Sequence, residues 1–378
     1  MSPSPARPPL LSLVSLIGGM ASAGLLQALV YPFRRPRAPT LRQHVLSAVI
    51  RAFLRRVIVA QLRYLMPPTS QRCLDFCKSK GEEPEILEVE VQHRKVLAHW
   101  IGSSGADIVI LFFHGGGYVQ PISVGHLEYM HRLVKDFSGP GKSKSLAVLV
   151  PEYSLAPEAT HPAQLREAAA VLSYLLKECN RPPADILISG DSAGAGLAFT
   201  LLSHMLHPHP DVPAITLSEP LLGAFLYSPW ISFGTRHDSY VNNANLDILV
   251  PRALRCWSAM YTSQNLDDPE RDPGLVSGDS YTEPLINDSS WWEGLHQVIS
   301  EILIWAGGNE ILLDGINAMD AKLRIGWQTG GGEPAKIFYI EEAEMAHAQP
   351  IMDAMANAKI KGSGQIAIEE WLRSRLER

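Results

Sequence analysis

Cysteine is scarce in this chain of 378 residues, which contains only Cys73, Cys77, Cys179 and Cys256. Cys73 and Cys77 are four residues apart, as on one face of a helix, but no second Cys or His pair completes a zinc-binding pattern. So few and so scattered thiols do not predict a disulfide framework. We therefore expect neither an essential disulfide nor a metal site.

Charge is also sparse. Charged residues make up 19% of the chain, hydrophobic residues 46%, and the formal net charge is -6. These proportions are typical of a globular protein and argue against disorder. Because no long basic stripe occurs in the central region, nucleic acid is not an expected partner. The length suits one large domain, or a core with a smaller cap.

Charged residues are absent from Leu10 to Tyr31, which reads LLSLVSLIGGMASAGLLQALVY. This stretch is long enough to cross a bilayer as a helix. We predict that residues 1–31 form an uncleaved single-pass membrane anchor, with the endoplasmic reticulum as the expected location. Two alternatives stay open: Ala21-Ser22-Ala23 fits the cleavage pattern of a signal peptide, which would give a secreted protein, and the stretch would also fit a buried helix.

The next segment, residues 32–84, is predicted to be a linker followed by N-terminal cap helices. Residues 32–43 are rich in proline and arginine. The basic cluster Arg34-Arg35-Pro36-Arg37 would place the rest of the chain on the cytosolic side of a membrane. His44 to Leu65 predicts one basic amphipathic helix that ends at Pro67-Pro68.

From residue 85 to 378, short apolar runs alternate with helical patterns. The predicted strands are Ile86–Val91, Val96–Ile101, Ile108–Phe113, Leu146–Val150, Ile186–Ser189, Gly223–Tyr227, Glu301–Ala306 and Lys336–Ile340. The predicted helices are His126–Phe137, Ala163–Lys177, Leu197–Leu206, Gly315–Trp327 and Gln365–Arg375. This alternation predicts an α/β fold with a mostly parallel sheet flanked by helices. The long insertion at about 229–300, rich in Trp, is predicted to form a helical cap over an apolar pocket together with residues 44–80.

One short motif stands at a strand-to-helix junction. The segment Gly190-Asp191-Ser192-Ala193-Gly194 matches the nucleophile-elbow pattern G-x-S-x-G, in which a serine sits on a sharp turn after a buried strand. The flanking glycines suit that turn because side chains there would collide with neighbouring elements. Ser192 is therefore the candidate nucleophile.

A second motif, His114-Gly115-Gly116-Gly117, follows the predicted strand Ile108–Phe113. Consecutive glycines leave backbone N–H groups accessible, and such donors stabilise the negative charge that develops on a carbonyl oxygen during serine attack. Both the sequence and the position match the oxyanion loop that accompanies a nucleophile elbow.

A serine nucleophile needs a base and an acid that orients the base, and in this fold they follow in the order Ser, Asp/Glu, His. Glu310 comes shortly after the predicted strand Glu301–Ala306 and is the candidate acid. Asp314, slightly later, is predicted to start a helix or support the loop. His347 is the only histidine beyond Glu310 and follows the last predicted strand, so it is the candidate base.

These motifs, with Glu152-Tyr153-Ser154-Leu155-Ala156-Pro157-Glu158, resemble the hormone-sensitive-lipase-like group of α/β-hydrolases over residues 85–375. The resemblance implies a carboxylic-ester hydrolase that uses no cofactor, with the N–H groups of Gly115, Gly116 and Ala193 as oxyanion donors. The family usually has Asp at the position of Glu310. The N-terminal anchor is similar to that of fungal steryl acetyl hydrolases, whose catalytic domain faces the lumen, in conflict with the charge bias above.

The expected substrate is a small hydrophobic ester, with a short acyl group such as acetyl on a sterol, terpenoid or polyketide alcohol. An amide or formamide hydrolase would use the same triad and is the alternative. A non-catalytic ligand receptor on this fold is less favoured, because none of the three triad residues is missing. The oligomeric state is not predicted.

Overall fold

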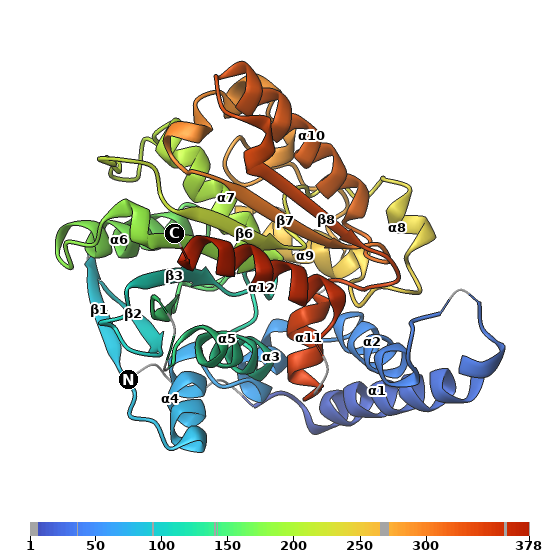
Figure 1. Cartoon of the computed structure of the whole chain (residues 1–378). Coiled ribbons are helices and arrows are strands. Elements are labelled where there is room, and N and C mark those ends of the chain that lie inside the picture. Colours follow the sequence, from blue (N-terminus) through green and yellow to red (C-terminus); the bar gives the residue numbers. More distant parts are fainter. Residues whose placement is uncertain are drawn as a thin grey trace.

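The central element of the computed structural model is an eight-stranded sheet (Figure 1). The structure describes residues 7–35, 37–92, 94–139, 141, 143–264, 272–358 and 361–377. The strands are β1 (Ile86–Val91), β2 (Arg94–Ile101), β3 (Ile108–Phe113), β4 (Leu146–Pro151), β5 (Ile186–Asp191), β6 (Gly223–Tyr227), β7 (Ile302–Gly307) and β8 (Ile337–Glu342). Their order is β1-β2-β4-β3-β5-β6-β7-β8. β2 pairs antiparallel with β1 and β4, and all other neighbours are parallel. The predicted mostly parallel sheet is confirmed.

The inner strands are apolar on both faces because helices cover both. β3 shows the alternation: Val109 and Leu111 belong to one buried cluster, and Ile110 and Phe112 to the other. One face packs against α6 (Ala163–Lys177), α7 (Ala193–Leu206) and α10 (Leu313–Thr329). The other packs against α4 (Thr69–Lys80), α5 (Val124–Phe137) and α12 (Ser363–Leu376). Continuous apolar strands are what burial on both faces requires.

The N-terminal region differs from the prediction in two places. α1 (Leu10–Val30) is a helix as expected, but the predicted helix over 44–65 is two helices, α2 (Leu41–Leu54) and α3 (Val59–Leu65). The break falls at the β-branched run Val57-Ile58-Val59, which disfavours helix continuation, and the Gln61 side chain accepts the Ile58 N–H at 3.1 Å. α2 also begins inside the predicted linker, because Thr40 Oγ1 accepts the Gln43 N–H at 3.2 Å and caps the helix.

The insertion between β6 and β7 contains α8 (Ser239–Asn242) and α9 (Pro251–Thr262), and residues 265–271 of it lie outside the described part. α9 shares a buried cluster with Leu54 and Leu62 of the N-terminal helices. Arg63 of α3 donates to the Val119 and Ala156 carbonyls, which joins these helices to the loops after β3 and β4. A helical cap therefore covers the carboxyl edge of the sheet, where active sites of open α/β sheets lie. α11 (Gln349–Met355) was not predicted and follows the β8 loop.

Candidate active site

Ser192 lies on the turn between β5 and α7, in a backbone conformation that few residues adopt. Its φ is 53° and its ψ is -121°, in the left-handed half of φ space that is strained for a residue with a side chain. The neighbouring glycines allow the turn, because a Cβ on Gly194 would lie 1.9 Å from the Phe113 carbonyl oxygen and one on Gly190 would lie 2.6 Å from it. The helix begins at Ala193, four residues before the predicted start. The strand, turn and helix of a nucleophile elbow are all present.

The glycine loop after β3 is held against this turn by Asp191. The Gly115 N–H donates to Asp191 Oδ1 at 2.7 Å, and His126 Nε2 is 2.9 Å from the same oxygen. Burial raises the pKa of Asp191, but the His126 imidazole and the Gly115 N–H outweigh it and hold that pKa below its ordinary value. The carboxylate is therefore ionised and occupies the Gly115 donor.

This contact corrects the predicted oxyanion donors. A backbone N–H has one hydrogen to give, so Gly115 cannot serve an oxyanion while it binds Asp191. Within the described residues, the N–H groups of Gly116, Gly117 and Ala193 have no hydrogen-bond partner. Gly117 takes the place of Gly115 in the candidate set. The sequence did contain a signal for Gly117, because it is the third glycine of the His114-Gly115-Gly116-Gly117 motif.

Glu310 and His347 come together although 37 positions separate them: Glu310 Oε2 lies 2.8 Å from His347 Nδ1. Both residues are buried, with exposed fractions of 0% for Glu310 and 2% for His347. His347 Nε2 is also buried and has no hydrogen-bond partner among the described residues. Because Glu310 holds Nδ1, the free Nε2 is the nitrogen left to exchange a proton with a hydroxyl. Asp314, by contrast, accepts the Ser239 N–H at 2.8 Å and does not contact His347.

The buried pair shifts both pKa values upward. Burial raises the pKa of Glu310, against the opposing effect of the His347 hydrogen bond. Burial lowers the pKa of His347, but the hydrogen bond and charge of Glu310 outweigh it and raise that pKa above its ordinary value of 6.5. A more basic imidazole is a better proton acceptor near neutral pH.

Two residues that the sequence did not indicate join the loop of Glu310 to the loop of His347. Ser228 Oγ donates to Glu310 Oε1 at 3.1 Å and accepts the Ala348 N–H at 2.9 Å. Asp247, 0% exposed, accepts the N–H of His347 at 3.0 Å through Oδ1 and that of Ile311 at 2.8 Å through Oδ2. Asp247 is thus a candidate positioning residue; its one sequence signal was a lone carboxylate among apolar residues in the insertion.

The cap contacts the site at two points. Arg51 of α2 is buried and donates to the Asp247 carbonyl. Trp257 of α9 covers the glycine loop so closely that a Cβ on Gly117 would lie 2.1 Å from its Cε3. Beside Trp257 is a cavity of about 180 Å³ between α9 and the N-terminal helices, lined largely by apolar side chains including Leu54, Val57, Leu62 and Met260.

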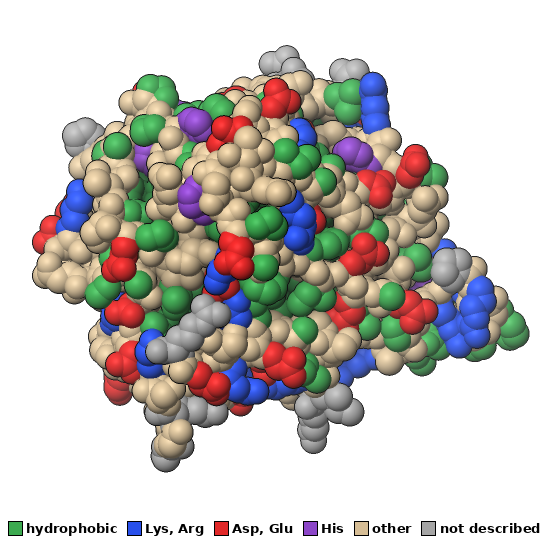
Figure 2. All heavy atoms as spheres, turned by 45° about the horizontal axis from the view of Figure 1, so that its top comes forward, with side chains coloured by type: hydrophobic (Ala, Val, Ile, Leu, Met, Phe, Trp, Pro, Cys, Tyr) green, Lys and Arg blue, Asp and Glu red, His purple; other side chains and the backbone are tan. Residues whose placement is uncertain are grey.

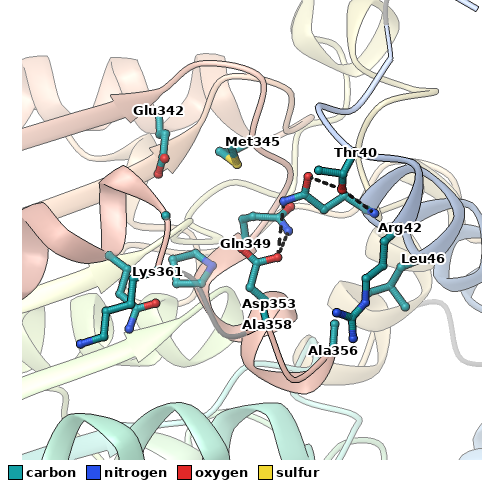
Figure 3. A pocket seen from close by; sticks show the side chains of 14 residues that line it. Thr40, Arg42, Leu46, Glu342, Met345, Gln349, Asp353, Ala356, Ala358 and Lys361 are labelled. Carbon is teal, nitrogen blue, oxygen red and sulfur yellow. Dashed lines mark hydrogen bonds between the residues drawn. The ribbon is translucent and has the colours of Figure 1, made fainter. Parts of the chain in front are cut away.

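A larger cavity, of about 430 Å³, lies between α2 and α11 (Figure 3). Its polar lining includes Thr40, Arg42, Gln349 and Asp353, and Gln349 Nε2 donates to Asp353 Oδ1 at 2.7 Å. None of the predicted site residues lines it. Within the described ranges, no group of three or more His, Cys, Asp or Glu side chains is arranged to hold a metal ion.

Residues 110–347 match a protein family described as having an alpha/beta hydrolase fold. The chain belongs to this family. It is 27% identical over 248 residues to an acetyl-hydrolase of Streptomyces hygroscopicus, covering 64% of this chain and 71% of that protein. It is 28% identical over 254 residues to an esterase of Acinetobacter venetianus, covering 66% and 73%. It is 33% identical over 142 residues to human hormone-sensitive lipase, covering 35% of this chain and 12% of that longer protein.

Solved structures support the fold of this family member. A bacterial esterase of the hormone-sensitive lipase family superposes with a TM-score of 0.57 at 22% identity, covering 98% of this chain and 100% of that one. Carboxyl esterase 2 of the fungus Tuber melanosporum gives a TM-score of 0.59 at 17% identity, covering 82% and 98%. The family match and the curated relatives together show that the chain is a hormone-sensitive-lipase-like carboxylic-ester hydrolase.

Proposed function

We propose that this enzyme cleaves esters with Ser192 as nucleophile, His347 as general base and Glu310 as the acid that orients it. Ser192 Oγ attacks the ester carbonyl as His347 Nε2 takes its proton, and the N–H groups of Gly116, Gly117 and Ala193 stabilise the oxyanion. His347 then protonates the departing alcohol, and water, activated by the same imidazole, hydrolyses the acyl-enzyme. The observation that carries this proposal is a buried His347 with Nδ1 held by Glu310 and Nε2 unpaired.

The proposed substrate is a short acyl ester of a hydrophobic alcohol such as a sterol, terpenoid or polyketide. Trp257 packs directly on Gly117 and so leaves little room for a long acyl chain on that side. The cavity beside Trp257 is lined largely by apolar side chains, and this apolar surface of the cap favours a hydrophobic alcohol part. The similarity to an acetyl-hydrolase favours acetyl as the acyl group.

We also propose that the N-terminal helix attaches the enzyme to a membrane. The helical segment Leu10–Phe33 has a mean hydropathy of 1.8 over its most apolar window and is long enough to span a bilayer. A signal sequence passes the same test but is removed from the mature protein. Sequencing of the mature N-terminus should find α1 intact, and a mature chain that begins after Ala23 would contradict the anchor.

A series of p-nitrophenyl esters tests the proposed reaction. The kcat/KM for the purified full chain should be highest for acetate and fall as the acyl chain lengthens, and Ser192→Ala should remove nearly all activity at unchanged folding. Equal kcat/KM for acetate and octanoate would contradict the short-acyl proposal. Preference for a matched p-nitroacetanilide over the acetate ester would support amide hydrolysis instead.

A further inference from the structure

The basic charge of this protein is unevenly distributed along the chain. Residues 1–74 contain ten arginines and no Lys, Asp or Glu. The remaining residues, 75–378, hold 23 basic and 39 acidic side chains, a net charge of -16. The N-terminal segment therefore carries a net charge of +10, while the rest of the chain is acidic overall. A partner that binds this end is expected to carry negative charge.

α1 lies alongside α2 and is attached to the protein by one face (Figure 1). Leu13, Leu16 and Gly24 are buried, and a Cβ on Gly24 would lie 3.0 Å from Val49 Cγ2. Gln27 Oε1 lies 3.0 Å from His44 Nε2 of α2, and Gln61 Nε2 of α3 donates to the Ser12 carbonyl at 3.3 Å. The packing and these hydrogen bonds would all be lost if α1 left α2.

The opposite face of α1 is an uncovered apolar stripe. Its large side chains, each exposed by between 56% and 88%, are Leu10, Leu11, Val14, Ile17, Leu25, Leu26 and Leu29, with Phe33 just beyond the helix. Such a concentration of apolar side chains is an interaction surface rather than a normal feature of a soluble exterior. The corner on the right of Figure 2 shows hydrophobic and basic side chains side by side.

Arginines border this stripe. A cleft of about 360 Å³ between α1 and α2 is lined by Arg51, Arg55 and Arg56. A Cβ on Gly19, near the middle of α1, would lie 3.0 Å from the Arg56 guanidinium carbon. Arg35 is exposed and follows Phe33 by two residues. Among the described residues, none of Arg35, Arg55 and Arg56 forms an ion pair with a carboxylate. Their charges are therefore available to lipid phosphates.

This arrangement favours one orientation of α1 at a bilayer. If α1 spanned the membrane in its present packing, Arg56 beside Gly19 would lie near the hydrocarbon centre, where an arginine is strongly unfavourable. If the packed pair α1 and α2 lies parallel to the surface instead, the exposed face of α1 enters the leaflet. The arginines at the end of α2 then remain among the headgroups and supply the polar side that α1 itself lacks.

We propose that α1 binds an anionic phospholipid membrane lying in the plane of one leaflet, with its exposed stripe among the acyl chains and Arg35, Arg55 and Arg56 on the lipid phosphates. The proposal rests on the membrane attachment proposed above and defines its mode. This binding mode would also hold the cap next to the membrane, because Arg51 of α2 contacts Asp247 in the cap insertion. A hydrophobic ester dissolved in the bilayer would then lie close to the cap.

Probe depth distinguishes the two modes. The full chain is first given the substitution Cys179→Ser, which removes the exposed native thiol. A single new cysteine is then placed at position 10, 17 or 29 (Leu10→Cys, Ile17→Cys or Leu29→Cys) and labelled with an environment-sensitive fluorophore. The depth of each probe is measured on phosphatidylserine-containing vesicles with depth-calibrated quenchers. The in-plane mode predicts the same shallow depth for all three probes. A much deeper probe at position 17 than at positions 10 and 29 would overturn it in favour of a spanning helix while leaving membrane attachment intact.

Charge variants test the lipid class by flotation. Replacing Arg35, Arg55 and Arg56 together with Gln should weaken partitioning onto phosphatidylserine vesicles about 100-fold, since each juxtamembrane basic residue contributes about five-fold. The control, Lys135→Gln with Lys144→Gln and Lys177→Gln, removes equal charge from the hydrolase domain and should change partitioning little. Equal loss in both variants, or equal binding to pure phosphatidylcholine, would overturn the arginine contacts. No flotation of a protein that still hydrolyses p-nitrophenyl acetate would refute membrane attachment but not the esterase.

Discussion

Replacing Glu310 with Gln is the sharpest test of the proposed triad, because the structure determines how the new amide must point. Glu310 Oε1 accepts from the Gly307 N–H at 2.6 Å and from Ser228 Oγ at 3.1 Å. An amide NH₂ at that position would face two donors, which costs about 1–3 kcal/mol for each buried donor left unpaired. The Gln carbonyl oxygen must therefore take the Oε1 position.

The NH₂ group then faces His347 Nδ1, which now lies 2.8 Å from Oε2. Nδ1 must accept this hydrogen bond, so the imidazole proton moves to Nε2. A protonated Nε2 cannot take the proton of Ser192. Imposing the wrong tautomer on a catalytic histidine reduces kcat about 10⁴-fold, equivalent to about 5 kcal/mol of transition-state stabilisation.

The assay is kcat for p-nitrophenyl acetate, with circular dichroism and thermal unfolding to verify the fold. Asp314→Asn is the matched control, because it makes the same chemical change at a carboxylate that contacts only the Ser239 region, and it should alter kcat less than about ten-fold. A Glu310→Gln enzyme that keeps a tenth of its kcat, or an Asp314→Asn enzyme that loses as much, would refute the assignment.

Three further predictions follow from the site. The pKa of His347 is raised above 6.5, and the imidazole must be neutral to act as a base, so kcat/KM should fall as the pH drops through a value above 6.5. A pH-rate profile with its acid midpoint below 6.5 would contradict this. Asp247→Asn should cost about 1–3 kcal/mol of unfolding free energy and lower kcat more than it raises KM; unchanged kcat in a folded variant would remove its positioning role. Trp257→Ala should raise the octanoate-to-acetate ratio of kcat/KM about ten-fold or more, and no change in that ratio would show that Trp257 does not limit the acyl group.

Much of the fold could be predicted because its signals are local. β3, β6 and α6 have the predicted bounds, since an inner parallel strand is a short apolar run and an amphipathic helix repeats at 3.6 residues. The sequence did not predict the division of the N-terminal region into α2 and α3. The Gln61 side chain accepts the Ile58 N–H where α3 begins, and this contact leaves no mark on the apolar pattern from which a helix is predicted.

The sequence by itself determined the candidate nucleophile, base and acid, because the glycines at 190 and 194 and the chain order leave few alternatives in this fold. Only the tertiary structure decided which glycine N–H groups stay free, because Asp191 at the end of β5 reaches the Gly115 donor after the neighbouring strand β3. It alone related Asp247 to His347, 100 positions away, through a hydrogen bond that folding creates. It also showed one side of an apolar helix covered and the other open, a difference that arises from packing against α2 and not from the composition of α1.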